Sequence, residues 1–166
     1  MARLAVSNAF AAATPNAITT TLQTLMFPKC AASNMRRFRV LEFSYGLIGP
    51  YSSADSSVQF DLTPCSAAGA GTAGGTQPTL QGLDGADTVF GLSVGTNFTG
   101  EPTTYTANVN YHNESINQRG TYRWFARDDL AQIVAPATAS AGIGWRAKSI
   151  SSGFTGNAVV SAILDE

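Results

Sequence analysis

One stretch decides the fold: Met35-Arg-Arg-Phe-Arg-Val-Leu-Glu-Phe-Ser-Tyr-Gly-Leu-Ile48, the longest with strand composition in this chain. Strands alternate with a period of two, and this stretch alternates in two halves. Phe38 and Val40 are apolar at even positions, whereas from Leu41 onward the apolar residues stand at odd positions. One extra residue at Val40–Leu41 would produce this change, as a β-bulge does. The alternative is a central strand buried on both faces at its middle. Either pattern predicts a core strand that neighbours must cover.

Around this stretch the chain predicts further short strands separated by turns. Ser57–Leu62 and Thr103–Tyr111 alternate apolar and polar residues, which is typical of half-buried antiparallel strands. Pro28 and Pro64 are expected to end the strands before them, and polar His112–Gln118 is interpreted as a loop. The remaining predicted strands are Ile18–Phe27, Val89–Val94, Arg119–Ala126, Ala131–Ala135, Ile143–Ala147 and Asn157–Glu166.

The composition favours an all-β chain. Charged residues make up 13% of the 166 residues, well below the typical quarter, and indicate either a surface covered by partners or a bland one. We predict an antiparallel β-sandwich or jelly-roll-like barrel of about eight strands. Residues 17–166 would form this single domain, and residues 1–16 an extended N-terminal arm. The N-terminus weakly resembles a signal peptide, but Ser7 and Asn8 interrupt its apolar run. We therefore interpret it as mature chain, an arm or a first strand.

Charge and cysteine content exclude several classes of function. The net charge is -1 and there is no basic tail, so we expect no direct contact with nucleic acid. No run of about 18 apolar residues predicts a membrane span. Cys30 and Cys65 are too few and too far apart for a metal knuckle. They could form one disulfide, but reduced thiols are expected for a protein made in a cytoplasm.

Motifs of catalytic or metal sites are weak in this sequence. Gly69–Gly74 matches G-x-G-x-x-G, but no helix pattern follows to hold a pyrophosphate. His112 is the single histidine, and we expect a surface residue rather than a member of a Ser-His-Asp triad. Asp84–Asp87 could contact Ca²⁺ but falls short of an EF-hand loop. Glu42 is expected to pair with a neighbouring arginine. We therefore predict no catalytic residue, no metal and no cofactor.

Basic and aromatic residues offer binding surfaces instead. Arg36, Arg37 and Arg39 form a small basic cluster that could contact phosphate or an acidic protein surface, although solvated or salt-bridged strand ends are favoured. Trp124 and Trp145 are expected to be core or interface anchors rather than a platform for sugars.

The C-terminal third carries a resemblance. Its motifs are Arg119-Gly-Thr-Tyr-Arg-Trp-Phe, Gln132-Ile-Val-Ala-Pro-Ala-Thr-Ala, Gly142-Ile-Gly-Trp-Arg-Ala and Ala158-Val-Val-Ser-Ala-Ile-Leu-Asp-Glu, and Arg37–Glu42 adds an earlier one. Together these short motifs resemble small virion proteins of tailed bacteriophages and cover most of the chain in order. The resemblance implies a β-sandwich or jelly-roll-like protein that coats or cements the capsid, often as a trimer. It carries over no catalytic residue.

The resulting hypothesis is a non-enzymatic virion protein, a capsid decoration or cement subunit. It would be made in the host cytoplasm and bind the major capsid protein on the virion surface as a homotrimer, without contacting nucleic acid or membrane. The candidate interface residues are Arg3, Leu4, Val6, Phe10, Arg36, Arg37 and Arg39.

Other functions stay open. A carbohydrate-binding, lectin-like sandwich of a tail fibre or receptor-binding protein would need an exposed Trp or Tyr beside polar side chains such as Asn108, Asn110 and Asp87. A jelly-roll coat protein that encloses a genome would need a basic arm, which Arg3 alone does not supply. A hydrolase is the least favoured alternative.

Overall fold

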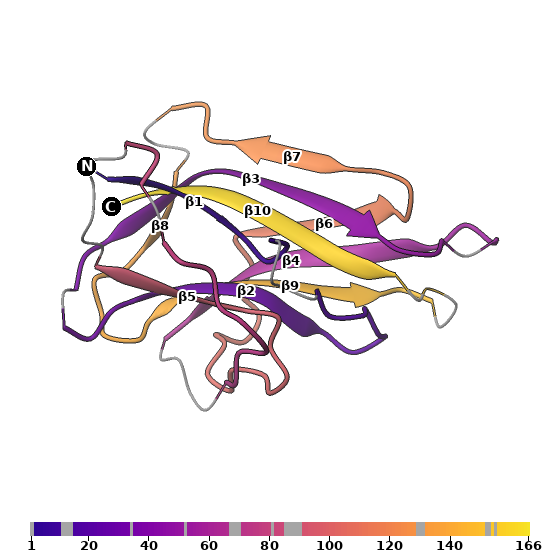
Figure 1. The fold of residues 1–166 in the computed structure, drawn as a ribbon, viewed down its shortest axis with the longest axis horizontal. Helices are drawn as coiled ribbons and strands as arrows, with labels where there is room; N and C mark the ends of the chain where they lie inside the picture. The colour runs from indigo at the N-terminus through magenta and orange to yellow at the C-terminus, as the bar shows by residue number, and fades with distance from the viewer. Residues whose placement is uncertain are drawn as a thin grey trace.

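Two five-stranded antiparallel sheets face each other in the computed structural model (Figure 1). The structure describes residues 2–10, 15–33, 35–51, 53–66, 71–80, 82–84, 91–128, 132–151, 154 and 156–166. The ten strands that these residues form are β1 (Arg3–Ser7), β2 (Gln23–Cys30), β3 (Phe38–Ile48), β4 (Ser57–Cys65), β5 (Leu92–Thr96), β6 (His112–Asn117), β7 (Tyr122–Phe125), β8 (Ile133–Ala135), β9 (Gly142–Ser149) and β10 (Asn157–Asp165).

Strand order confirms the predicted antiparallel β-sandwich. Sheet A has the order β1-β10-β3-β7, and β8 also pairs with β3; sheet B has the order β5-β2-β9-β4-β6. The two sheets are not closed into a barrel. Among the described residues, no helix is long and apolar enough to cross a membrane.

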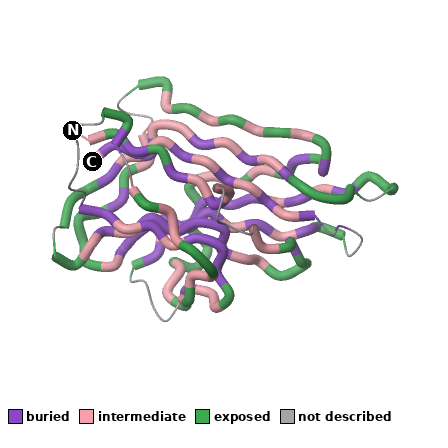
Figure 2. Tube along the Cα trace, viewed as in Figure 1, coloured by how far each residue is buried: buried purple, intermediate pink, exposed green. Residues whose placement is uncertain are grey.

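The core lies between the two sheets, where Figure 2 shows the buried residues gathered. Aromatic rings hold the sheets together. Tyr45 of sheet A stacks on Phe60 of sheet B with 4.3 Å between ring centroids, and Phe43 meets Trp145 edge-on at 6.3 Å. Trp145 is fully buried. Each large aromatic side chain buries 150–250 Å² or so, which makes this contact a large part of the stabilising apolar burial.

The predicted bulge in β3 is confirmed. Along β10, Ile163 lies opposite Glu42 and the next residue, Leu164, lies opposite Val40. Leu41 is therefore the extra residue on β3. Because of this insertion, the residues on both sides of it face the core: Phe38 and Val40 before it, and Phe43, Tyr45 and Leu47 after it.

Two predicted strand ends are wrong, because both prolines lie inside strands. Pro28 is in register with Val94 of β5, and Pro64 with Ile143 of β9. Proline removes one ladder hydrogen bond, and near a strand end this loss does not end the pairing.

The region after residue 100 was also predicted wrongly. Thr103–Tyr111 is not a strand: its single bridge joins Tyr105 to Cys65, and Asn108 has a positive φ of 60°. His112–Asn117, predicted as a loop, pairs with β4 along its whole length. The apolar side chains of the first segment cover sheet B or face solvent, whereas the polar second segment suits an exposed sheet edge.

The remaining strand predictions hold in outline. The N-terminal segment, an arm or a first strand from its sequence, forms β1 over Arg3–Ser7 and pairs with the last strand, β10. Of the predicted strand Val89–Val94, residues 89 and 90 lie outside the described residues. Cys30 and Cys65 are both buried and form no disulfide with each other.

A buried ion pair fastens a loop to the outer side of sheet B. The Arg146 guanidinium donates to both carboxylate oxygens of Asp61, at 2.8 and 2.9 Å, and to the Thr63 hydroxyl at 2.8 Å. The Tyr105 ring lies over this guanidinium, 4.3 Å from its centre. The ring also packs against Gly144, where any Cβ would collide with the Tyr105 hydroxyl. Charge, hydrogen bonds and ring contact thus hold the loop around Tyr105 on the sheet.

Replacing Asp61 tests the cost of leaving the buried Arg146 guanidinium without its partner. The Asp61 and Arg146 side chains are only 4% and 16% exposed, and removing one partner of a buried pair costs about 3–5 kcal/mol. We expect Asp61→Asn to lower the free energy of unfolding in urea by roughly that amount. Glu42→Gln is the control, because it breaks the exposed Glu42–Arg123 pair, typically worth about 0–1 kcal/mol. Equal losses in both variants would contradict this reading.

Candidate functional site

The two sheets differ in what covers their outer faces. Sheet B is covered at one end by a small second core in which Phe98 and Tyr105 pack on Phe27 and Cys65. The outer face of sheet A carries the small side chains of Ala5, Ser7, Ser44 and Ser161 where β1, β10 and β3 lie side by side, with Glu42 and Ile163 next to them. A groove of about 710 Å³ lies on that face.

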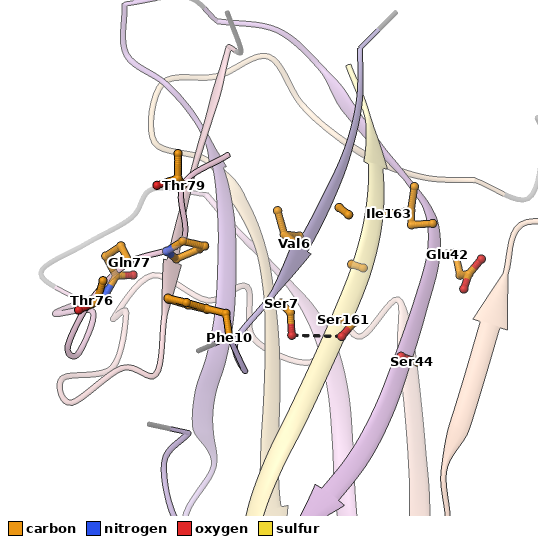
Figure 3. Close-up of a pocket in the computed structure, with 13 residues that line it drawn as sticks. Val6, Ser7, Phe10, Glu42, Ser44, Thr76, Gln77, Thr79, Ser161 and Ile163 are labelled. Carbon is orange, nitrogen blue, oxygen red and sulfur yellow. Dashed lines mark hydrogen bonds between the residues drawn. The ribbon is translucent and has the colours of Figure 1, made fainter. Parts of the chain in front are cut away.

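Small hydroxyl side chains form the floor of this groove (Figure 3). Ser7 of β1 lies opposite Ser161 of β10, which lies opposite Ser44 of β3. Three serines thus stand in one row across three strands, and the Ser161 hydroxyl donates to the Ser7 hydroxyl at 3.1 Å. The Ser44 hydroxyl makes no hydrogen bond with a described residue. Because the side chains are small, the row leaves a hollow above the sheet.

The wall of the groove comes from the segment Thr76–Thr79 and from Phe10, which extends toward that segment in Figure 3. Gln77 fixes the segment in place. Its amide nitrogen donates to the Gly74 carbonyl at 2.9 Å, and its amide oxygen accepts from the Thr96 backbone N–H at 2.7 Å. The wall is therefore attached to β5 of the opposite sheet.

Charged side chains border the groove at the end where the chain termini meet. The pairing register places Asp165 of β10 between Arg3 of β1 and Arg39 of β3 on the outer face of sheet A. One carboxylate oxygen of Asp165 is buried without a hydrogen-bond partner. Neither arginine forms an ion pair with Asp165 among the described residues; Arg39 donates to the Gln132 side chain at 3.1 Å. We call Arg3, Asp165 and Arg39 the arginine row.

The structure brings some of the predicted interface residues together and separates others. Arg36 and Arg37 are exposed near the arginine row, and the Arg36 guanidinium lies 3.8 Å from the Glu166 carboxylate. Phe10 lies at the groove, beyond the other end of β1. Leu4 and Val6, by contrast, are buried in the core between the sheets. Strand alternation turns these two side chains inward, so we do not carry them forward as contact residues.

His112 lies outside the groove, at the start of edge strand β6. Its Nε2 atom is 2.9 Å from the Tyr122 hydroxyl of β7, an edge strand of the other sheet. Burial lowers the pKa of His112, and the nearby Glu114 carboxylate only partly offsets this effect. His112 and Tyr122 thus bridge the two sheets, and no described carboxylate hydrogen-bonds to the imidazole as a triad would require.

The other sequence candidates are not assembled into a chemical site. Glu42 accepts a 2.7 Å hydrogen bond from Arg123, which confirms the predicted arginine pair and lowers the pKa of the Glu42 carboxyl. Of Asp84–Asp87, residues 85–87 lie outside the described residues. Of Gly69–Gly74, residues 69 and 70 lie outside them, and Thr72 forms a β-bridge with Gly100 where a dinucleotide fingerprint would start a helix. Among the described residues, no group of three or more His, Cys, Asp or Glu side chains could hold a metal ion.

Comparison with protein-family models gives no match to this chain, and comparison with curated proteins gives none either. The site therefore rests on its own geometry. The serine row was missed in the sequence because its three members are 37 and 117 residues apart, at Ser7, Ser44 and Ser161. The available signal was a serine at an outward position in each of two predicted strands.

The lowered pKa of His112 gives a pH dependence of stability. The unfolded chain takes up a proton near the ordinary value of 6.5, whereas the folded chain does so only at lower pH. The folded protein therefore loses stability as pH falls from about 7.5 through this interval. Urea unfolding at pH 7.5 and 5.5 should show this loss in the natural protein and a smaller loss in His112→Gln. Because the chain has one histidine, an unchanged pH dependence in the variant would contradict the assignment.

Proposed function

We propose that this protein is a non-enzymatic structural subunit of a virion that decorates or cements the capsid shell. It binds the major capsid protein through the outer face of sheet A. The observation that supports this most directly is the groove of about 710 Å³ over the serine row, bordered by the arginine row. The motif resemblance to small virion proteins of tailed bacteriophages gives the expected partner.

Shape and charge on this face suit a protein partner. Small side chains on a sheet allow another polypeptide to approach the strands closely. Phe10 offers an aromatic contact at the groove, and aromatic residues are enriched at interfaces. Arg3 and Arg37 are exposed at one end and form no ion pair with a described residue. They would meet acidic side chains of the shell.

The alternative, a carbohydrate-binding sandwich, gains less support from the geometry. Trp145 is fully buried and is unavailable for stacking on a sugar. Asn110 accepts a 2.8 Å hydrogen bond from Thr63 on the outer face of sheet B, whereas Trp124 shares the inner face of sheet A with Phe43. The tryptophan rings and Asn110 therefore lie on different surfaces, and the Tyr105 ring on the outer side of sheet B already covers the Arg146 guanidinium.

Filling the groove tests the proposed contact face. Ser161→Arg places a long side chain over the serine row, and we expect it to abolish co-sedimentation with shells of the major capsid protein encoded in the same genome. Gln59→Arg is the matched control, because Gln59 lies on the outer face of sheet B. Binding should survive in the control, and both variants should unfold at a temperature close to that of the natural protein. Undiminished binding of Ser161→Arg would exclude this face.

The assembly state is tested separately. We propose a homotrimer on the shell, as the resemblance implies. Analytical ultracentrifugation of protein released from shells should then give a mass three times that of the chain. A monomer at every concentration, with no affinity for shells, would refute the proposed function. Selective hits on a glycan array would instead support the carbohydrate-binding alternative.

A further inference from the structure

A second cluster of functional groups lies on the side of the sandwich where edge strands β6 and β7 follow each other along the chain (Figure 1). The register places His112 and Glu114 of β6 beside Leu62 and Phe60, on the inner face of sheet B. Tyr122 and Trp124 of β7 lie beside Tyr45 and Phe43, on the inner face of sheet A. All four side chains of the two edge strands are partly exposed. We call His112, Glu114, Tyr122 and Trp124 the edge cluster.

Aromatic faces make up one part of the edge cluster. The Trp124 ring stacks on Phe43 with 5.0 Å between centroids and 16° between planes, and Tyr122 stacks near Tyr45 at 6.1 Å and 24°. Each ring thus covers a core aromatic with one face while the residue stays partly exposed. Faces of tryptophan and tyrosine attract cations through the ring quadrupole.

A carboxylate without a partner makes up the other part. Glu114 is partly buried among these rings, yet it forms no ion pair or hydrogen bond with any described residue. Two other strand carboxylates are paired, since Asp61 holds Arg146 and Glu42 holds Arg123, whereas Asp165 at the far end of sheet A keeps one unpartnered oxygen. An unpaired carboxylate beside aromatic faces favours a positively charged group.

Two buried polar atoms at the edge cluster also have no hydrogen-bond partner. They are the hydroxyl of Tyr45, a residue that is 1% exposed, and Nδ1 of His112. The His112 and Tyr45 rings are 6.4 Å apart between centroids. Buried polar groups are nearly always hydrogen-bonded, so a hydrogen-bonding ligand at the edge cluster would find two unused groups.

We infer that the edge cluster binds an organic cation, an alkylammonium or guanidinium group such as the tip of a lysine or arginine side chain. Glu114 supplies the countercharge, Trp124 and Tyr122 supply the aromatic faces, and Tyr45 and His112 supply hydrogen-bonding groups. This inference is independent of the proposed capsid contact, because it concerns the inner faces of β6 and β7 rather than the outer face of sheet A.

Binding can be measured by two-dimensional NMR, following the Trp124 indole N–H and the His112 ring during titration with butylammonium or propylguanidinium. We expect saturable shifts at these two residues in the millimolar range, and none with neutral 1-pentanol. A peptide with one central lysine in an extended segment identifies the source. Tighter binding than butylammonium assigns the site to a protein side chain, and equal binding assigns it to a free cation.

Matched variants distinguish a loss of cation binding at the edge cluster from a general effect on the fold. Trp124→Leu should weaken butylammonium binding about three- to thirty-fold, the range of a cation–π contact. Glu114→Gln should weaken it about two- to five-fold, as for loss of an exposed ion pair. Phe125→Leu and Ser115→Ala are controls on the outward positions of the same two strands, and they should bind as the natural protein does. Equal affinity for 1-pentanol, or unchanged affinity in both Trp124→Leu and Glu114→Gln, would overturn the inference.

Discussion

The rest of the sandwich depends on one inserted residue in its longest strand. Leu41 shifts the alternation of β3 so that apolar side chains face the core on both sides of the insertion. At the same place, β3 changes its second partner: its first residues pair with β8, and Glu42–Tyr45 pair with β7. The Leu41 carbonyl accepts a 2.9 Å hydrogen bond from the Ala126 backbone N–H, just after β7 ends. The bulge thus keeps apolar side chains of β3 facing the core on both sides of Leu41, and it lies where the neighbouring strand changes from β8 to β7.

The outer faces of the two sheets differ in what covers them. On sheet B, a buried ion pair and the Tyr105 ring hold a loop against the strands. Such a pair contributes little net stability compared with an apolar contact, but it fixes which segment covers the sheet. On sheet A, the serine row and Ala5 stand at outward positions of β1, β10 and β3 beside Glu42 and Ile163, and a groove stays open above them. A face built this way is suited to an external partner.

The strand pattern was largely predictable, because alternation reports which side chains face the core. The slip at Val40–Leu41 was visible since both halves of the strand are long enough to show their phase. Thr103–Tyr111 was wrongly predicted as a strand because its apolar and polar residues alternate equally well. The segment packs on the outer side of sheet B instead of pairing within it. His112–Asn117 was not predicted as a strand because an edge strand with one exposed face needs few apolar residues. Contacts between distant strands, such as the serine row, depend on register and leave no local pattern.

Next to the edge cluster, the core contains a buried hydroxyl group without a hydrogen-bond partner. A buried hydroxyl without a partner costs about 1–3 kcal/mol, and the Tyr45 hydroxyl is such a group. Its burial raises the pKa of Tyr45 well above the usual range, so the group stays neutral and available for hydrogen bonding. Phenylalanine would fill the same space and keep the stack on Phe60 without this cost. Packing alone therefore does not account for a tyrosine here. A ligand that hydrogen-bonds at the open side of the sandwich would.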